Sequence, residues 1–267
     1  MDRVIVVTGA SSGLGQSTAN YLGKQGFRVF GSCRNPKKHP APDHFTLLAL
    51  DLNNPKTIDS FVDAILEKAG RVDVLVNNAG VGITGPVEEL DEKALKDHFQ
   101  TNLFGPLALT QAFLPELRKH KGAIINITSI AGYMGLPFRG AYSASKGAFH
   151  LISEALRMEV KNQGVRVMTI APGDYATDIA SRRYHEPVQP NSPYADVYQY
   201  SLDTMNAHVD EGNDPEEIAK AIDRLLRQKS PSIHHRVGPF MQKLSVILKR
   251  LLPDTWYEKL LMNHYKL

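Results

Sequence analysis

The feature that most constrains the fold of this chain is the alternation of short apolar runs with stretches in which apolar residues recur at helical spacing. Continuous apolar strands that alternate with helices are typical of a parallel sheet that is buried on both faces. The alternation therefore predicts an α/β fold, a doubly wound parallel sheet with helices on both faces, whose ligands bind at the carboxyl ends of the strands. The predicted strands are Val4–Val7, Arg28–Ser32, Phe45–Leu50, Val72–Val76, Ala123–Ile127 and Val165–Ile170, and the predicted helices are Gly15–Lys24, Lys56–Lys68, Glu92–Arg118 and Tyr142–Gln163.

A single domain over residues 1–267 is expected, because this length suits one large α/β unit. The net charge of +3, from 31 Lys and Arg against 28 Asp and Glu, is too small to indicate binding of nucleic acid. Cys33 is the only cysteine, which excludes an intramolecular disulfide and fits a reducing compartment. No stretch approaches the roughly 20 apolar residues of a membrane span, and Val4–Val7 is too short for the core of a signal peptide. A cytoplasmic protein without a metal site is the expectation.

A glycine-rich turn, Thr8–Gly15, follows the first predicted strand. Glycines there allow the backbone to approach a pyrophosphate closely, and the next helix offers N–H groups and a favourable dipole at its N-terminus. A strand–helix turn without a ligand is the alternative, and Gln16 and Ser17 disfavour a nucleoside-triphosphate P-loop. The position after the first strand favours a dinucleotide in a Rossmann-type fold. The predicted cofactor-binding residues of this turn are Gly9, Ser11, Ser12, Gly13, Leu14 and Gly15.

The end of the second predicted strand bears on which dinucleotide is bound. NAD sites commonly carry an acidic side chain there, which holds the ribose 2′-hydroxyl. Here the strand is followed by Cys33, Arg34 and Asn35, without a carboxylate. The guanidinium fork of Arg34 suits a 2′-phosphate, although a solvated surface arginine is the alternative. The predicted cofactor is therefore NADP(H), with NAD(H) less favoured.

Three polar residues around the fifth predicted strand have the types and spacing of a carbonyl-reducing site. Ser129 follows Ala123–Ile127, and Tyr142 and Lys146 lie four residues apart on one face of the next helix. A phenol is a weak acid at neutral pH, but an ammonium group one turn away stabilises the phenolate and suits it to general acid–base chemistry. Ser129 is placed to hydrogen-bond the substrate oxygen. The Tyr–Lys spacing is common by chance, and only its combination with Ser129 and the glycine-rich turn predicts catalysis.

The order of these motifs resembles that of the short-chain dehydrogenase/reductase family, and the similarity runs from about residue 3 to residue 240. In that family an asparagine completes a proton relay through water to the lysine. The resemblance therefore adds Asn102 to the catalytic residues Ser129, Tyr142 and Lys146. The alternative role of Asn102 is to satisfy backbone groups at a kink beside Gly105-Pro106.

The resemblance also implies further cofactor contacts at the carboxyl ends of the strands. Asn78 has a structural alternative, which is to fix the turn after its strand. Tyr175 departs from the family pattern, in which a smaller aliphatic residue is usual, so its bulk is expected to narrow the site while its backbone keeps the contact to the carboxamide. The implied cofactor-binding residues beyond the glycine-rich turn and Arg34 are Asp51, Leu52, Asn78, Ala79, Gly80, Tyr142, Lys146, Pro172, Gly173, Tyr175 and Thr177.

The last third of the chain carries the predictions about the substrate. Residues 178–213 occupy the position of the family's substrate loop, and the tyrosines in it either line an apolar cleft or pack the loop onto the body. The segment Arg236–Pro239 and the helical tail 241–267 resemble the 17β-hydroxysteroid-dehydrogenase-like branch, which implies a bulky apolar ketone or secondary alcohol. The tail is expected to pack or to form a subunit contact, with a peripheral membrane helix as the less favoured alternative. The family resemblance implies a homodimer or homotetramer.

The sequence thus predicts an NADP-dependent short-chain dehydrogenase/reductase. NADPH would donate hydride to a carbonyl carbon while Tyr142 protonates the oxygen, and the reverse reaction uses the same groups. A non-catalytic NADP(H)-binding sensor or scaffold is the alternative from another class, and the presence of all four catalytic residue types disfavours it. A sugar-nucleotide epimerase or dehydratase uses related chemistry, but it normally carries a larger C-terminal domain than the roughly 90 residues after Thr177 allow.

Overall fold

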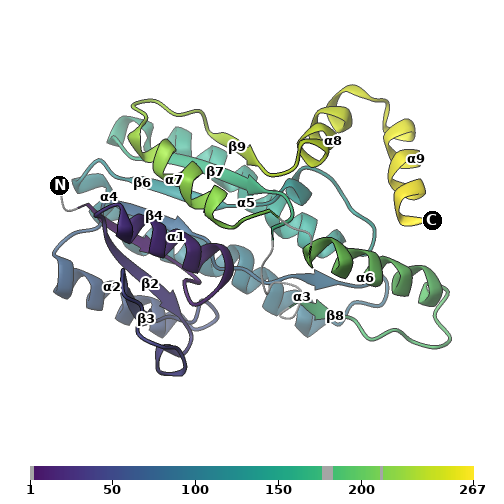
Figure 1. Ribbon diagram of the computed structural model, residues 1–267, viewed down its shortest axis with the longest axis horizontal. Helices are drawn as coiled ribbons and strands as arrows, with labels where there is room; N and C mark the ends of the chain where they lie inside the picture. The colour runs from purple at the N-terminus through teal and green to yellow at the C-terminus, as the bar shows by residue number, and fades with distance from the viewer. Residues whose placement is uncertain (1–2, 176–182, 211–212) are drawn as a thin grey trace.

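A parallel β-sheet forms the centre of the computed structural model, which describes residues 3–175, 183–210 and 213–267, with only the backbone of residues 206–210. The strands are β1 (Val4–Val7), β2 (Arg28–Cys33), β3 (Thr46–Ala49), β4 (Val74–Asn77), β5 (Ile83–Thr84), β6 (Ala123–Ile127), β7 (Arg166–Pro172), β8 (Tyr184–His185) and β9 (His234–Val237). Seven of them form the sheet in the order β3-β2-β1-β4-β6-β7-β9, which confirms the predicted doubly wound sheet, and β5 pairs with β8 (Figure 1). The order reverses between β1 and β4, where the ligands of such sheets bind.

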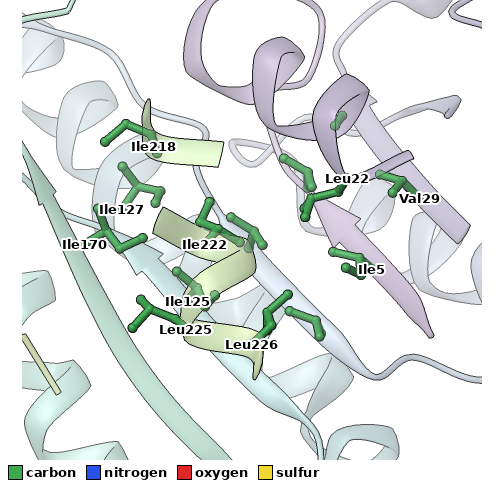
Figure 2. Close-up of a cluster of buried hydrophobic side chains, with 14 of the residues drawn as sticks. Ile5, Leu22, Val29, Ile125, Ile127, Ile170, Ile218, Ile222, Leu225 and Leu226 are labelled. Carbon is green, nitrogen blue, oxygen red and sulfur yellow. The ribbon is translucent and has the colours of Figure 1, made fainter. Parts of the chain in front are cut away.

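Helices cover both faces of the sheet, as predicted. They are α1 (Gly13–Lys24), α2 (Pro55–Ala69), α3 (Glu92–Phe99), α4 (Gly105–Lys119), α5 (Gly140–Val160), α6 (Ala195–Asp210), α7 (Glu216–Arg227), α8 (Phe240–Leu251) and α9 (Asp254–Tyr265). On one face α1 and α7 lie side by side, and Leu22 and Ile222 pack with Ile125 of the sheet (Figure 2). On the other face α2 and α4 contribute Phe61 and Phe113 to a second buried cluster. Burial on both faces explains the continuous apolar runs of the central strands.

The six predicted strands agree with the observed ones, but β5, β8 and β9 were not predicted. The strands β1 and β6 are confirmed at both ends, and the others differ from the prediction by one or two residues, which is the usual uncertainty of element boundaries. The sequence analysis missed β9, which pairs with β7 at the edge of the sheet. Its sequence, His234-His235-Arg236-Val237, has no apolar run, because an edge strand is not buried on both faces.

The predicted helical stretch Glu92–Arg118 is helical throughout, but it is not one regular α-helix. The helix α3 ends at Phe99, a π-helical turn (η2, Gln100–Phe104) follows, and α4 begins at Gly105. Pro106 is the physical reason, because it has no N–H to donate to the carbonyl four residues earlier, that of Asn102, and its ring crowds that carbonyl. The Gly105 N–H instead donates to the carbonyl of Gln100, five residues back, which is the π-helical pattern.

The last third of the chain is more regular than the sequence suggested. Within the described residues, the predicted substrate loop 178–213 contains β8 and α6, whereas 178–182 and 211–212 lie outside the described part. The tail is helical, as predicted, and forms α8 and α9 with a break at Pro253. Leu248 and Leu252 pack against a buried cluster that includes Met134, whereas Trp256 is 63% exposed. Among the described residues, no helix has the length and apolar character needed to cross a bilayer.

Candidate active site

The glycine-rich turn is shaped by close contacts between backbone segments. Gly9 and Gly13 have positive φ angles, +68° and +53°, which glycine adopts without strain. A Cβ atom on Gly15 would lie 2.3 Å from the carbonyl oxygen of Gly9 and 2.4 Å from Nδ2 of Asn78. The first turn of α1 therefore packs directly on the end of β1 and on the segment after β4. Any side chain at position 15 would push the helix N-terminus away from the turn.

The other residues of the predicted cradle surround this contact. Ser11 and Ser12 are half-buried just before α1, and Leu14 lines the adjoining cavity. The end of β2 is held beside the turn by a 2.8 Å hydrogen bond from the Ala10 N–H to the carbonyl oxygen of Ser32. Arg34 follows β2 directly and is exposed to solvent. The structure thus places an arginine at the strand end where a ribose substituent is expected.

The Asn78 side chain ties two strand ends together. Its Nδ2 donates to the carbonyl oxygen of Thr8 at 2.8 Å, and the N–H groups of Asn78 and Ala79 both donate to Oγ1 of Thr8 at 2.9 Å. These bonds join the segment after β4 to the end of β1, which is the structural role offered as an alternative for Asn78. Asn78 and Gly80 also line the cavity below the turn.

The residues Asp51 and Leu52 precede α2 on the far side of the turn. Oδ1 of Asp51 accepts a 3.0 Å hydrogen bond from the N–H of Asn53, and its carbonyl accepts one from the Thr57 hydroxyl. Leu52 is 6% exposed and packs so closely on Gly105 that a Cβ there would lie 2.6 Å from its own Cβ. The side chains of both residues are thus engaged in local structure, and their contact with an adenine stays a prediction.

Nine of the predicted catalytic and cofactor-binding residues line one cavity. Ser129 starts the 3₁₀ turn η3 (Ile130–Tyr133) after β6, where its Oγ accepts a 3.1 Å hydrogen bond from the Ala131 N–H. Tyr142 and Lys146 lie on the first turns of α5. The predicted residues that line the cavity are Leu14, Asn78, Gly80, Ser129, Tyr142, Lys146, Pro172, Gly173 and Tyr175. Thr177 lies outside the described residues.

Lys146 is deeply buried beside this cavity. Its side chain donates from Nζ to the carbonyl oxygen of Ile127 at 3.1 Å, and the residue is 5% exposed. Burial lowers the pKa of the Lys146 ammonium, and the proximity of Tyr142 acts in the opposite direction. The backbone of Gly80 lies against it, because a Cβ there would be 3.3 Å from the Lys146 Nζ and 3.2 Å from the Asn102 Oδ1. Lys146 and Asn102 are therefore neighbours across Gly80.

Asn102 lies in the π-helical turn and is 1% exposed. Its Oδ1 accepts a 2.8 Å hydrogen bond from the N–H of Val81, and its Nδ2 donates to the Val81 carbonyl at 2.9 Å. Asn102 thus fixes the segment that borders Lys146, rather than the kinked helix backbone suggested as its alternative role. A relay through water to Lys146 stays a prediction.

The sequence analysis missed His98, which lies one helical turn before Asn102. Its Nε2 is 2.8 Å from Oγ of Ser145 and 3.2 Å from Nδ2 of Asn102, and its ring centroid is 6.1 Å from that of Tyr142. Burial, reinforced by the positive charge of Lys146, lowers the pKa of His98 to about 4. The four-residue spacing to Asn102 is the signal that would have found it.

A second and larger cavity, of about 340 Å³, adjoins the first. Ser129, Arg139, Asp174 and Arg183 line both cavities, so the two communicate beside the catalytic residues. The apolar side chains of the second cavity come from η3 and the segment after it, from α6 and from the tail: Ile130, Met134, Leu136, Met205, Met241 and Leu261. The sequence analysis named neither arginine, and no local pattern marks them.

The tyrosines of the segment 184–200 include examples of both predicted roles, packing onto the body and lining a cavity. Tyr198 is 1% exposed in a buried cluster with Phe138, and its hydroxyl donates to the carbonyl of Thr84 at 3.0 Å. Tyr200 lines the larger cavity. Tyr175 lines the smaller cavity, but it is 4% exposed, belongs to the buried cluster of Ile218 and Ile222, and donates from its hydroxyl to Glu217 at 3.1 Å. Its bulk is therefore held mainly in the core.

The sheet, the glycine-rich turn and the Ser–Tyr–Lys cavity define a nucleotide-dependent oxidoreductase. Residues 3–187 match the family model described as short chain dehydrogenase. The chain belongs to the short-chain dehydrogenase/reductase family, as its motifs predicted. The 17β-hydroxysteroid-dehydrogenase-like branch stays a prediction.

Two relatives are similar along the whole chain. A 3-ketodihydrosphingosine reductase of Bacteroides thetaiotaomicron is 37% identical over 265 residues, which cover 98% of this chain and 98% of that protein. The crystal structure of a short-chain dehydrogenase from Streptomyces avermitilis is 31% identical, with a TM-score of 0.81 and 97% of each chain covered.

Two more distant structures share the fold and hold different dinucleotides. One, from Burkholderia cenocepacia, contains NADP (24% identity, TM-score 0.77, 97% of each chain), and the other, from Burkholderia phymatum, contains NAD (22%, 0.81, 93% of each chain). The fold alone therefore does not decide between the two cofactors.

Proposed function

We propose that this protein transfers hydride between NADP(H) and a carbonyl or secondary alcohol group on a bulky, mainly apolar substrate. The observation that carries the proposal is the convergence of Ser129, Tyr142 and Lys146 on a cavity that also borders the cofactor-binding residues and opens into a larger apolar one. Both components of the reaction, a dinucleotide and a carbonyl compound, thus have a place next to the same phenol.

The residues at the carboxyl ends of the strands fit a nicotinamide dinucleotide. The glycines let the turn and the N-terminus of α1 approach a diphosphate, and the first turn of α1 carries no acidic residue that would repel it. Lys146 and the backbone of Gly80 border the position of the nicotinamide ribose that the family resemblance implies. The cofactor, when bound, supplies or accepts the hydride.

The chain's own residues handle the proton and the substrate oxygen. Ser129 donates a hydrogen bond to that oxygen and stabilises the charge that develops on it. Tyr142 donates the proton in reduction and accepts it in oxidation, and the Lys146 ammonium stabilises the phenolate between these steps. Asn102 and His98 hold the wall beside Lys146, with Asn102 as the predicted anchor of the relay water.

The preference for NADP(H) rests on Arg34. The residue is exposed directly after β2, and no carboxylate stands at that strand end to hold a 2′-hydroxyl. Arg34→Glu is expected to shift the ratio of kcat/KM for NADPH over NADH toward NADH by about tenfold or more, since it replaces a phosphate-binding group by one that repels phosphate. Lys37→Glu, which makes the same charge change on the neighbouring turn, is the control. An unchanged ratio in Arg34→Glu would contradict the preference.

The cavity walls constrain the substrate beyond its apolar body. The guanidinium carbon of Arg139 lies 5.4 Å from the ring centroid of Tyr142, and Nη1 of Arg183 is buried without a hydrogen-bond partner among the described residues. A buried donor without a partner is costly, so a ligand group that accepts its hydrogen bond stabilises the complex. A substrate with a hydrogen-bond-accepting or anionic group near the carbonyl fits this wall.

The test is a matched assay with NADPH and NADH over a panel of carbonyl compounds. The panel contains steroid, long-chain aliphatic and aromatic ketones, each with and without a carboxylate, and 3-ketodihydrosphingosine, because of the name of the Bacteroides thetaiotaomicron relative. Oxidation of NADPH with a bulky ketone is the expected result. A wild-type protein that binds NADPH but reduces none of them would favour the sensor or scaffold alternative.

The mechanism is tested by Tyr142→Phe, which removes the hydroxyl and keeps the ring. We expect kcat to fall by about 100-fold or more, the usual contribution of a general acid, with little change in NADPH affinity measured by fluorescence titration. Near-normal turnover by this variant would show that another group transfers the proton.

We further propose that the protein acts in the cytoplasm as a homodimer or homotetramer. Leu151 and Met158 of α5 are 64% and 71% exposed, which gives this helix an apolar surface for subunit contact. Light scattering coupled to size exclusion measures the mass directly. Co-sedimentation of full-length and tail-deleted protein with liposomes tests the membrane alternative, which equal, negligible pelleting would end.

A further inference from the structure

A second polar cluster lies on α5, beyond the catalytic residues. His150 and Glu154 are one helical turn apart, and His234 reaches them from the start of β9. The Nε2 atoms of His150 and His234 approach the same carboxylate oxygen, Oε1 of Glu154, at 3.6 and 2.7 Å. One donor atom from each of the three side chains lies within 4.8 Å of the others. Neither the proposed reaction nor the family motifs use these residues.

Aromatic contacts hold the two imidazoles in place. The rings of His150 and His234 are stacked, with centroids 3.8 Å apart and an interplanar angle of 15°. The ring of Tyr133 packs edge-on against His150 at 4.7 Å from the other side. The side chains of His150 and His234 are 11% and 26% exposed, and that of Glu154 is 42% exposed. The cluster is thus preformed on its inner side and open to water at the carboxylate.

A hydrogen bond to Thr169 orients His234. Its Nδ1 lies 2.9 Å from the Thr169 hydroxyl, which in turn donates to the carbonyl oxygen of Ile233 at 3.5 Å. Where the hydroxyl accepts from Nδ1–H, the Nε2 lone pair is directed toward the Glu154 oxygen. The 2.7 Å contact then requires a cation between the two atoms, either a proton or a metal ion. A ligating histidine whose other nitrogen is held in this way is typical of protein metal sites.

We propose that His150, Glu154 and His234 bind a divalent transition-metal ion, with Zn²⁺ as the best match. Two imidazoles and one carboxylate are a known zinc ligand set, whereas Mg²⁺ and Ca²⁺ prefer oxygen ligands only. In a tetrahedral site with bonds of 2.0–2.1 Å, the donor atoms lie about 3.3 Å apart, and the two measured distances to Glu154 bracket this value. Because the rings are stacked, one of them must turn about its Cβ–Cγ bond to aim both lone pairs at one ion. Water fills the remaining position on the exposed side.

The bound ion would act on the structure rather than on the reaction. His150 lies eight residues after Tyr142 on α5, about 12 Å along the helix axis. The ion would fasten the edge strand β9 to α5, and β9 leads directly into α8, which lines the larger cavity. Metal binding is therefore expected to stabilise the fold by mass action and to leave NADPH affinity unchanged.

Calorimetric titration of tag-free, chelator-treated protein with ZnCl₂ tests the proposal. We expect one Zn²⁺ per chain, no binding of Mg²⁺, and a rise in Tm with Zn²⁺. Glu154→Gln, His150→Gln and His234→Gln should each weaken Zn²⁺ binding by about tenfold or more, and Thr169→Val, which keeps all three ligands, by about 10- to 100-fold. His235→Gln, on the neighbouring position of β9, is the matched control and should bind as the wild type does.

Two outcomes would overturn the proposal. The first is a wild-type protein that takes up no stoichiometric Zn²⁺, in which case a proton rather than a metal ion lies between His234 and Glu154. The second is Zn²⁺ binding that survives in the combined His150→Gln, His234→Gln variant, which would place the ion elsewhere. The exposed Glu154→Gln change keeps the test informative if a histidine variant does not fold, since circular dichroism and Tm identify that case.

Discussion

The two ends of the catalytic cavity are built from different kinds of contact. At the cofactor end, strand ends, glycines and the first turn of α1 meet backbone to backbone, as at Gly15, where there is no space for a side chain. At the substrate end, the wall includes side chains from η3 and the segment after it, from α6 and from the tail helices. A polar contact joins Gln242 of α8 to Asp174, through bonds of 2.9 and 2.6 Å. The cofactor end is thus shaped by backbone contacts, whereas the substrate end is shaped by side chains that substitution can change without moving the backbone.

The largest expected effect concerns His98, which lies beside the catalytic lysine at the cofactor end. Its pKa is about 4 in the folded protein because of burial and the charge of Lys146, against 6.5 for an exposed histidine. Between these pH values the unfolded chain binds a proton that the folded protein does not, so the free energy of unfolding falls as the pH falls from 6.5 to 4. The full difference corresponds to about 3 kcal/mol.

This pH dependence is measured by denaturant unfolding of wild type and His98→Gln across that range. The variant should lose less stability on acidification, because glutamine does not titrate. The exposed His44→Gln serves as the control and should keep the wild-type slope. Identical slopes in wild type and His98→Gln would mean that His98 is protonated in the folded protein.

The next effect tests the backbone packing at the cofactor end. Gly15→Ala places a methyl group where two backbone contacts leave no room, and overpacking of this kind costs about 1–3 kcal/mol, a factor of roughly 5–150 in an equilibrium. NADPH affinity, measured by fluorescence titration, should fall, and the loss should not depend on which substrate is used in the activity assay. Gly135→Ala is the matched control, since a Cβ there meets no atom within 4 Å. Unchanged affinity in Gly15→Ala would show that the N-terminus of α1 is adjustable.

The smallest effect tests the substrate end. Gln242→Ala removes both hydrogen bonds to Asp174, each worth about 1 kcal/mol net. We expect KM for a bulky carbonyl substrate to rise severalfold while NADPH affinity stays the same. An equal loss of NADPH affinity would contradict the distinction between the two ends, because it would show that the tail contributes to the cofactor site through the adjacent Gly173.

The features that could be predicted from the sequence lie mainly at the cofactor end of the cavity. The strands, the glycine-rich turn and the Tyr142–Lys146 pair were predictable because each is encoded by neighbours in the sequence, as an apolar run, a glycine pattern or a one-turn spacing. Residues brought together by tertiary packing left no such signal: Arg139 and Arg183 are far apart in the chain yet line the same two cavities. The edge strand β9 was missed for a third reason, because its polar sequence hides it from a search for apolar runs.

The π-helical turn at Asn102 behaves as a one-residue insertion in an otherwise regular helix. The i→i−5 bond of the π-helical turn holds the extra residue as a bulge, so removal of one residue between Phe99 and Gly105 would restore a regular ladder and change the direction of the side chains within the turn. Asn102 would then face away from Val81, and the segment beside Lys146 would lose the two bonds that hold it. The catalytic geometry thus depends on the length of this helix, so a single-codon deletion here should be as damaging as the loss of a catalytic side chain.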